Sequence, residues 1–76
     1  MKIKILGTGC SKCRKLEEET KQAASEMGLD FDIEKVTDLK DIMSYGVMMT
    51  PALVVNGEVK LTGKVPARED IKKLLM

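Results

Sequence analysis

Polar and apolar residues alternate at the start of the chain. Residues 2–6 read Lys-Ile-Lys-Ile-Leu, and a period of two is typical of a β-strand with one buried face. The Gly-Thr-Gly of residues 7–9 ends this pattern. Over residues 11–27 apolar and small side chains recur every three or four positions, which predicts a helix that stops at Gly28. Its predicted buried positions are Cys13, Leu16, Thr20, Ala23, Ala24 and Met27.

Two further elements are predicted in the middle of the chain. Residues 29–34 alternate between apolar and acidic side chains, so we predict a second strand with one buried face. Thr37 can then cap a short helix that ends at Gly46. This helix carries the apolar residues Leu39, Ile42 and Met43.

The last third of the chain predicts a hairpin and a closing helix. Residues 52–55 are continuously apolar, which is the pattern of a central strand. Asn56-Gly57 is the strongest short hairpin signal, so residues 58–62 form the returning strand. Pro66 suits the first turn of a final helix, whose inward positions are Ile71, Leu74 and Leu75.

These elements together predict an α/β fold with the order β-α-β-α-β-β-α. The opening β-α-β unit requires parallel strands joined by a right-handed crossover, whereas the hairpin must be antiparallel. We therefore expect a four-stranded mixed sheet with helices on both faces. No linker, repeat or low-complexity tract interrupts the pattern, so residues 1–76 are interpreted as one domain.

Composition and charge narrow the classes of function. The 76 residues are 43% hydrophobic, and 13 basic side chains nearly balance 12 acidic ones. This balance gives no broad electrostatic reason to bind nucleic acid. No apolar run approaches the roughly 20 residues needed to span a bilayer, and residues 1–6 are too short for the apolar region of a signal peptide. We therefore expect a cytoplasmic protein, and monomer is the default oligomeric state.

The two cysteines, Cys10 and Cys13, lie where the first strand gives way to the first helix. A helix N-terminus offers unpaired N–H groups and the positive end of the macrodipole, which stabilise a thiolate. A thiolate is the species that attacks a disulfide. We interpret Cys10 as the nucleophile and Cys13, at the start of the buried stripe, as its more sheltered resolving partner.

The sequence gives less support to other roles of the cysteine pair. A structural disulfide here would close a loop of four residues, which the chain-entropy model values at about 2 kcal/mol before strain. A structural zinc site needs four ligands, and this chain has no histidine and no third cysteine. No metal is therefore expected. Two inert buried thiols stay open as an alternative.

Positive charge near the cysteines has two interpretations. Lys12 lies between the two sulfurs in sequence and is the best candidate to lower the pKa of the Cys10 thiol. The same lysine equally fits a solvated helix face, where Coulomb effects are small.

The segment Met49-Thr50-Pro51-Ala52 is the second candidate functional motif after the cysteine pair. A proline that opens an interior strand cannot donate a ladder hydrogen bond, and it biases Thr50 toward extended geometry. A cis Thr50-Pro51 bond is one solution, and the residues alone leave cis and trans both open. Met48 and Met49 fit either an adaptable binding surface or the core, and we expect at least one of them in the core.

The chain resembles the small thioredoxin/glutaredoxin-like disulfide oxidoreductases, in particular the minimal thioredoxins. The features that carry the resemblance are the cysteine pair after the first strand, the Thr-Pro before the third, the Asn-Gly hairpin and the closing helix. The resemblance covers essentially the whole chain. It implies that Cys10 attacks, that Cys13 resolves, and that Thr50-Pro51 is a cis-proline element at the active site. It further implies that the Thr50 backbone pairs with an extended substrate and that Gly63 keeps the groove open, although Gly63 alone fits a loop or bulge equally well.

The chain departs from these families in three ways. No Trp precedes Cys10, the residues between the cysteines are Ser-Lys, and the sequence Thr62-Gly63-Lys64 lacks the Gly-Gly and acidic residue common in glutaredoxins. Thioredoxin's potential and partner choice therefore do not transfer, and neither does glutathione binding. No residue clearly matches thioredoxin's buried carboxylate.

The leading hypothesis is a thiol–disulfide oxidoreductase that reduces protein disulfides through a mixed disulfide. Its partners would be disulfide-containing proteins and an electron-donating reductase, and no cofactor is expected. A carrier of Cu(I), which two thiolates suit, is the alternative, but such carriers usually end in a strand. A non-catalytic thioredoxin-like binding module is the third hypothesis, and the two intact cysteines argue against it.

Overall fold

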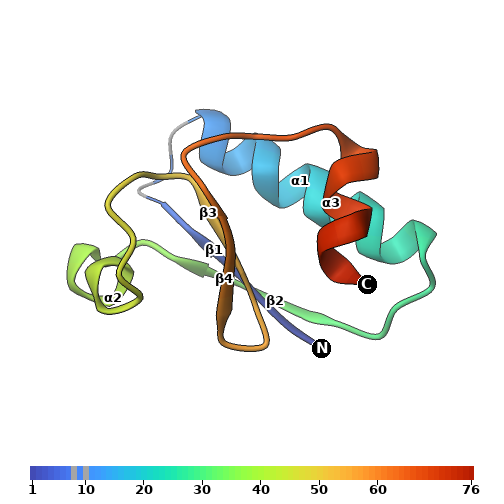
Figure 1. Cartoon of the computed structure of the whole chain (residues 1–76), viewed down its shortest axis with the longest axis horizontal. Coiled ribbons are helices and arrows are strands. Elements are labelled where there is room, and N and C mark those ends of the chain that lie inside the picture. The colour runs from blue at the N-terminus through green and yellow to red at the C-terminus, as the bar shows by residue number, and fades with distance from the viewer. Residues whose placement is uncertain (8, 10) are drawn as a thin grey trace.

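The computed structural model describes residues 1–7, 9 and 11–76 (Figure 1). In these residues the predicted order β-α-β-α-β-β-α is confirmed. The elements are β1 (Lys2–Leu6), α1 (Ser11–Glu26), β2 (Asp32–Val36), α2 (Leu39–Ser44), β3 (Ala52–Val55), β4 (Glu58–Thr62) and α3 (Arg68–Leu75).

The four strands form one mixed sheet in the order β2-β1-β3-β4. Strand β1 is parallel to β2 and antiparallel to β3, and β4 is antiparallel to β3. Asn56 and Gly57 form the β3–β4 turn with φ angles of 52° and 83°, as a type I′ hairpin turn requires. The prediction of a mixed sheet with an antiparallel hairpin is therefore correct.

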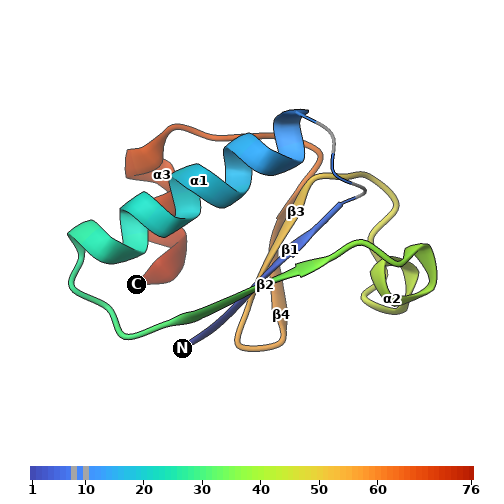
Figure 2. The same cartoon turned by 180° about the vertical axis from the view of Figure 1, so that it is seen from behind.

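Helices cover both faces of the sheet, as the sequence predicts. Figures 1 and 2 show α1 and α3 side by side on one side of the sheet and α2 beyond the other. Strand β3 contributes to both interiors, because successive side chains of a strand point to opposite faces. Leu53 and Val55 pack in the core beneath α1 and α3, whereas Ala52 and Val54 pack with Ile42 of α2.

The larger core is aliphatic and lies between the sheet and the two long helices. Its buried residues are Ile3, Ile5, Leu16, Ala23, Ala24, Leu53, Val55, Leu61, Ile71 and Leu75. An ionic cluster also joins α1 to α3. Arg68 donates to Glu19 at 2.9 Å and to Glu26 at 2.7 Å. The hydrogen bond from Arg68 lowers the pKa of Glu19, and those from Lys72 and Arg68 lower the pKa of Glu26.

The second strand differs from its prediction in position and burial. It runs over Asp32–Val36, so Leu29 and Phe31 precede it, and its side chains are exposed or half-buried. The reason is its place at the sheet edge beside β1, where neither face is fully covered. The apolar residues Leu29, Phe31 and Ile33 still pack against the larger core while partly buried.

The starts of the two shorter helices also differ from their predictions. Asp38, rather than Thr37, caps α2, since its side chain accepts a hydrogen bond from the Lys40 N–H at 2.8 Å. Both residue types cap helices well, so composition alone does not choose between neighbours. The N-cap of α3 is Ala67, and Pro66 precedes the helix instead of occupying its first turn.

One buried side chain of the core has an unsatisfied polar atom. Thr20 on α1 is fully buried, and among the described residues its Oγ1 has no hydrogen-bond partner. Replacing Thr20 by valine keeps the side-chain shape and removes this hydroxyl. We expect Thr20→Val to raise the free energy of unfolding by about 1 kcal/mol, measured by urea denaturation.

Thr20→Ser is the matched control for this substitution. It keeps the hydroxyl and removes only the methyl group, so we expect it to lower stability by about 1 kcal/mol. A Thr20→Val protein less stable than the parent would show that the hydroxyl is satisfied in solution.

Candidate functional site

Cys13 is the third residue of α1 and faces inward. Its side chain is 5% exposed, so its predicted burial is confirmed. The sulfur lies against Gly7, because a Cβ built at Gly7 would overlap the Cys13 Sγ and would lie 3.0 Å from its Cβ. Gly7 in turn donates its N–H to the Val36 carbonyl at 3.0 Å. The backbone between β1 and α1 is thereby held against the sulfur.

A small cavity borders this buried cysteine. Its volume is about 130 Å³, which is room for water beside polar groups. The described residues that line it are Ile5, Gly7, Gly9, Cys13, Arg14, Lys35 and Thr37. Cys13 is therefore sheltered from bulk solvent while its surroundings still admit small molecules.

The other predicted nucleophile, Cys10, lies outside the described residues, as does Thr8. Its predicted exposure and reactivity therefore stay predictions. In sequence Cys10 precedes Ser11, the first residue of α1. The first turn of this helix contains no acidic residue, so no carboxylate there opposes the positive end of the helix dipole.

Thr50, Pro51 and Gly63 come together at the start of β3. The Thr50–Pro51 peptide bond is cis, Pro51 is buried and Thr50 is exposed. Gly63, just after β4, has a φ of 74° and donates its N–H to the Pro51 carbonyl at 2.7 Å. A Cβ at Gly63 would lie 3.2 Å from the Met49 side chain, so any larger residue at this position would crowd Met49.

Strand register places this segment beside the Cys13 sulfur. Leu6 pairs with Ala52 on β3, and Ala52 pairs with Thr62 on β4. The residues one step beyond these partners, Gly7, Pro51 and Gly63, therefore form a row across the end of the sheet. We call Gly7, Pro51 and Gly63 the sheet-end row. Because Cys13 packs on the first member, the buried thiol and the proline segment lie at the same end of the sheet.

Lys12 lies at the solvent-exposed edge of this site. It is exposed on the first turn of α1, and it lines a hollow of about 360 Å³. The other residues that line this hollow are Lys15, Gly63, Lys64 and Val65. The structure thus brings Lys12 close to Gly63. Lys64, which sequence reasoning did not select, joins this basic group because the chain returns to α1 after β4.

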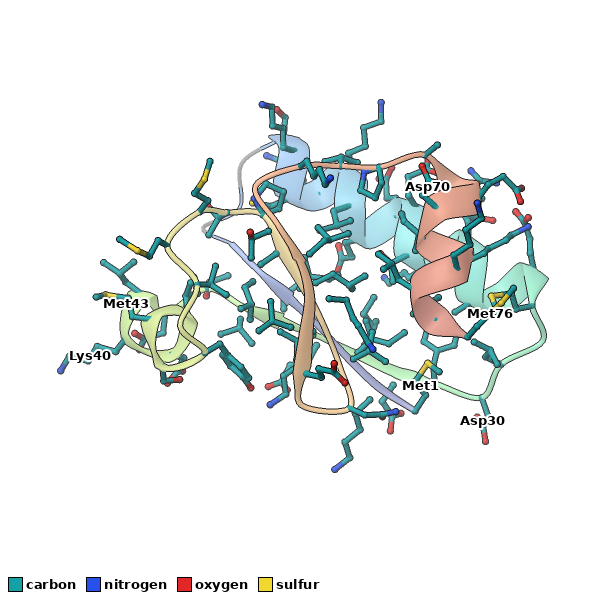
Figure 3. The ribbon with its side chains drawn as sticks, viewed as in Figure 1. Met1, Asp30, Lys40, Met43, Asp70 and Met76 are labelled. Carbon is teal, nitrogen blue, oxygen red and sulfur yellow. The ribbon has the colours of Figure 1, made fainter. Side chains whose placement is uncertain are left out.

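The segment before Pro51 is more exposed than expected. Met48 is 98% exposed and Met49 63% exposed, so the prediction that one of them lies in the core is wrong. Val47 is the buried residue of this connection. Leu39 and Met43 of α2 are also exposed, and Figure 3 labels Met43 on this outer helix. With Ile42, Val47, Met48 and Thr50 they line a hollow of about 280 Å³.

Neither a metal cluster nor a membrane-spanning element is found in the described part of the chain. Over residues 1–7, 9 and 11–76, no three side chains from His, Cys, Asp and Glu gather as a metal-binding group. None of the helices in the same residues is both long enough and apolar enough to cross a bilayer.

The structure has a thioredoxin-like fold. Its defining features are the strand order β2-β1-β3-β4, two helices over one face of the sheet and a cis-proline at the sheet end. The family model described as "Thioredoxin domain" matches residues 1–76. The chain therefore belongs to the thioredoxin family, and its general activity is thiol–disulfide oxidoreduction. Its architecture agrees with the fold expected from the sequence.

Three curated relatives extend this result. The chain is 43% identical to a thioredoxin of Methanothermobacter thermautotrophicus over 75 residues, covering 99% of this chain and 97% of the relative. It is 41% identical to a thioredoxin of Methanocaldococcus jannaschii over 73 residues, 96% of this chain and 84% of the relative. A probable thioredoxin of Methanothermobacter marburgensis is 34% identical over 65 residues, which cover 82% of this chain and 75% of the relative.

The copper-carrier alternative gains no support from these findings. The matched relatives are described as thioredoxins, and the last described element is helix α3 rather than a strand.

Proposed function

We propose that this protein reduces protein disulfides through a dithiol formed by Cys10 and Cys13. The main observation behind the proposal is the position of the Cys13 sulfur, which is buried against Gly7 in the sheet-end row. A thiol held there is shielded from external disulfides and is kept close to the helix start. This is the arrangement that a resolving cysteine needs.

The proposed exchange has two covalent steps. The Cys10 thiolate attacks one sulfur of the substrate disulfide, a Cys10–substrate bond forms, and the other substrate sulfur leaves as a thiolate. Cys13 then loses its proton and attacks the Cys10 sulfur, which expels the second substrate thiolate. Two electrons pass to the substrate, the departing thiolates take up two protons, and a Cys10–Cys13 disulfide remains. An electron-donating reductase returns two electrons and two protons to complete the cycle.

Substrate binding is assigned to the segment beside this pair. Thr50 is exposed and immediately precedes the buried Pro51 and strand β3, so its backbone is well placed for an extended substrate to pair with it. Gly63 contributes by the absence of a side chain, since the Met49 side chain already fills the adjacent space. Met48, with its flexible thioether, supplies an adaptable apolar contact for different partners.

The proposal also covers the state of the whole chain and the role of Lys12. We treat residues 1–76 as one domain that works as a monomer in the cytoplasm, where cysteine pairs are usually kept reduced and act transiently. Lys12 is assigned a supporting role in lowering the pKa of the Cys10 thiol. The exchange itself requires no cofactor or metal.

Two measurements on the unmodified protein test the proposal. Reduction of insulin disulfides, with dithiothreitol as electron source, should proceed well above the rate of dithiothreitol alone. Under limiting iodoacetamide, mass spectrometry of the reduced protein should find Cys10 alkylated first and Cys13 much later, because the latter is 5% exposed. Equal, slow alkylation of both thiols together with no insulin reduction would refute the proposed chemistry.

A further inference from the structure

Three lysines gather beside the sheet-end row, and the proposed exchange does not use them together. Lys12 and Lys15 come from the first two turns of α1, and Lys64 follows β4. All three are exposed and line the hollow of about 360 Å³ described above. We call Lys12, Lys15 and Lys64 the lysine triad.

The lysines of the triad form no ion pair with the carboxylates of the described residues. Among those residues, none of the three lysines has a carboxylate oxygen within 4.0 Å of its nitrogen, whereas Lys35, Lys60, Arg68 and Lys72 all form such ion pairs. Lys15 also borders a second hollow with Glu18 and Glu19. It helps to lower the pKa of Glu19, whose main partner is Arg68. With a net charge of only +1 over the chain, the triad is a local concentration of positive charge.

The triad borders the groove assigned to the substrate. Gly63 belongs to both, because it lines the lysine hollow and donates its N–H to the Pro51 carbonyl. A segment that lies over Pro51 and continues past Gly63 therefore enters the hollow. On the other side of Thr50 the surface is apolar, with Leu39, Met43 and Met48. The two ends of the groove thus differ in the chemistry that they present.

We infer that the lysine triad binds Asp or Glu side chains of the partner protein, located next to its reactive disulfide on the Gly63 side of the groove. This inference rests on the proposed function and names the chemistry of the substrates that the site selects. Lysine ammonium groups are point charges on flexible stems, so they suit carboxylates in varied positions better than one ligand of fixed shape. Complementary surface charge acts mainly on the rate of association.

The test compares two disulfide-containing peptides that differ only in their flanking residues. One peptide has Asp and the other Lys on both sides of an intramolecular disulfide, and neutral 2-hydroxyethyl disulfide serves as a third substrate. The variant is Lys15→Glu/Lys64→Glu, which leaves Lys12 in place. The control is Lys21→Glu/Lys73→Glu, which has the same net charge and changes two exposed lysines outside the hollow.

We expect the unmodified protein to prefer the Asp peptide in kcat/KM by about three- to tenfold, as a few exposed ion pairs allow. The preference should fall as salt rises. The Lys15→Glu/Lys64→Glu variant should reverse it toward the Lys peptide, while the control variant keeps it. All three proteins should reduce 2-hydroxyethyl disulfide at similar rates.

Two outcomes would overturn the inference and are distinguishable. Equal kcat/KM for both peptides in the unmodified protein, independent of salt, would remove the proposed selectivity and leave disulfide reduction intact. The same loss of preference in both double variants would assign it to net charge instead of the triad. If none of the three disulfides is reduced, the proposed function itself fails. The salt dependence of the unmodified protein still tests the selectivity where a variant does not fold.

Discussion

Cys10→Ser is expected to lose disulfide reductase activity down to the uncatalysed background, a loss on the order of 10³-fold or more. The reason is that serine does not ionise at neutral pH, so no group remains to attack the substrate sulfur. The measurement is the reduction of insulin disulfides with dithiothreitol as electron source. Stability should change little, because the substitution replaces one sulfur by oxygen.

Cys13→Ser is the matched control for this prediction. The first attack can still occur, but the mixed disulfide is not resolved, so a covalent adduct with the substrate should accumulate and be visible by mass spectrometry. Cys10→Ser should form no such adduct. Comparable residual activity in the two variants, or adducts on both, would contradict the division of roles between attacking and resolving thiols.

Gly7→Ala is expected to have the second largest effect and to lower both stability and activity. Gly7 is buried, and the added methyl group would overlap the Cys13 sulfur and approach its Cβ to 3.0 Å. Either the sulfur or the backbone must move, which costs about 1–3 kcal/mol in a packed interior. Resolution of the mixed disulfide should also slow. Urea denaturation and single-turnover reduction of a disulfide peptide measure the two effects.

A double-mutant cycle isolates the contact behind this prediction. Cys13→Ala removes the sulfur, so Gly7→Ala should cost clearly less in that background than in the unmodified protein. Gly7 does not have a positive φ, unlike Gly9, Gly28, Gly46, Gly57 and Gly63, so backbone strain is not the expected cause. An equal cost in both backgrounds would show that the methyl group clashes with something other than the Cys13 sulfur.

Two glycines let side chains pack closely against the end of the sheet. At Gly7 the missing side chain makes room for the Cys13 sulfur, and at Gly63 it makes room for the Met49 side chain. Both lie in the sheet-end row, one on each side of Pro51. Small residues at these two positions thus let the Cys13 and Met49 side chains lie directly against the backbone at the strand ends.

Element order and core were predictable because they depend on local periodicity. The alternation in residues 2–6, the helical spacing of Cys13, Leu16 and Thr20, and the Asn56-Gly57 turn all appear in the structure as predicted. Two predictions failed where neighbouring residues suit one role. Asp38 caps α2 although Thr37 is also a good cap, and Val47 enters the core where Met48 or Met49 was expected.

By itself the sequence determined the family, the strand and helix order, and the pair Cys10 and Cys13 as the reactive candidates, since short-range pattern and residue chemistry carry that information. Only the tertiary structure decided that Gly7, Pro51 and Gly63 lie in one row and that Lys64 joins Lys12 and Lys15. Gly7 and Pro51 become neighbours because strand register pairs residues more than 40 positions apart, such as Leu6 with Ala52. Lys64 joins the two lysines because the chain returns to α1 after β4. Register of that kind depends on how the whole core packs.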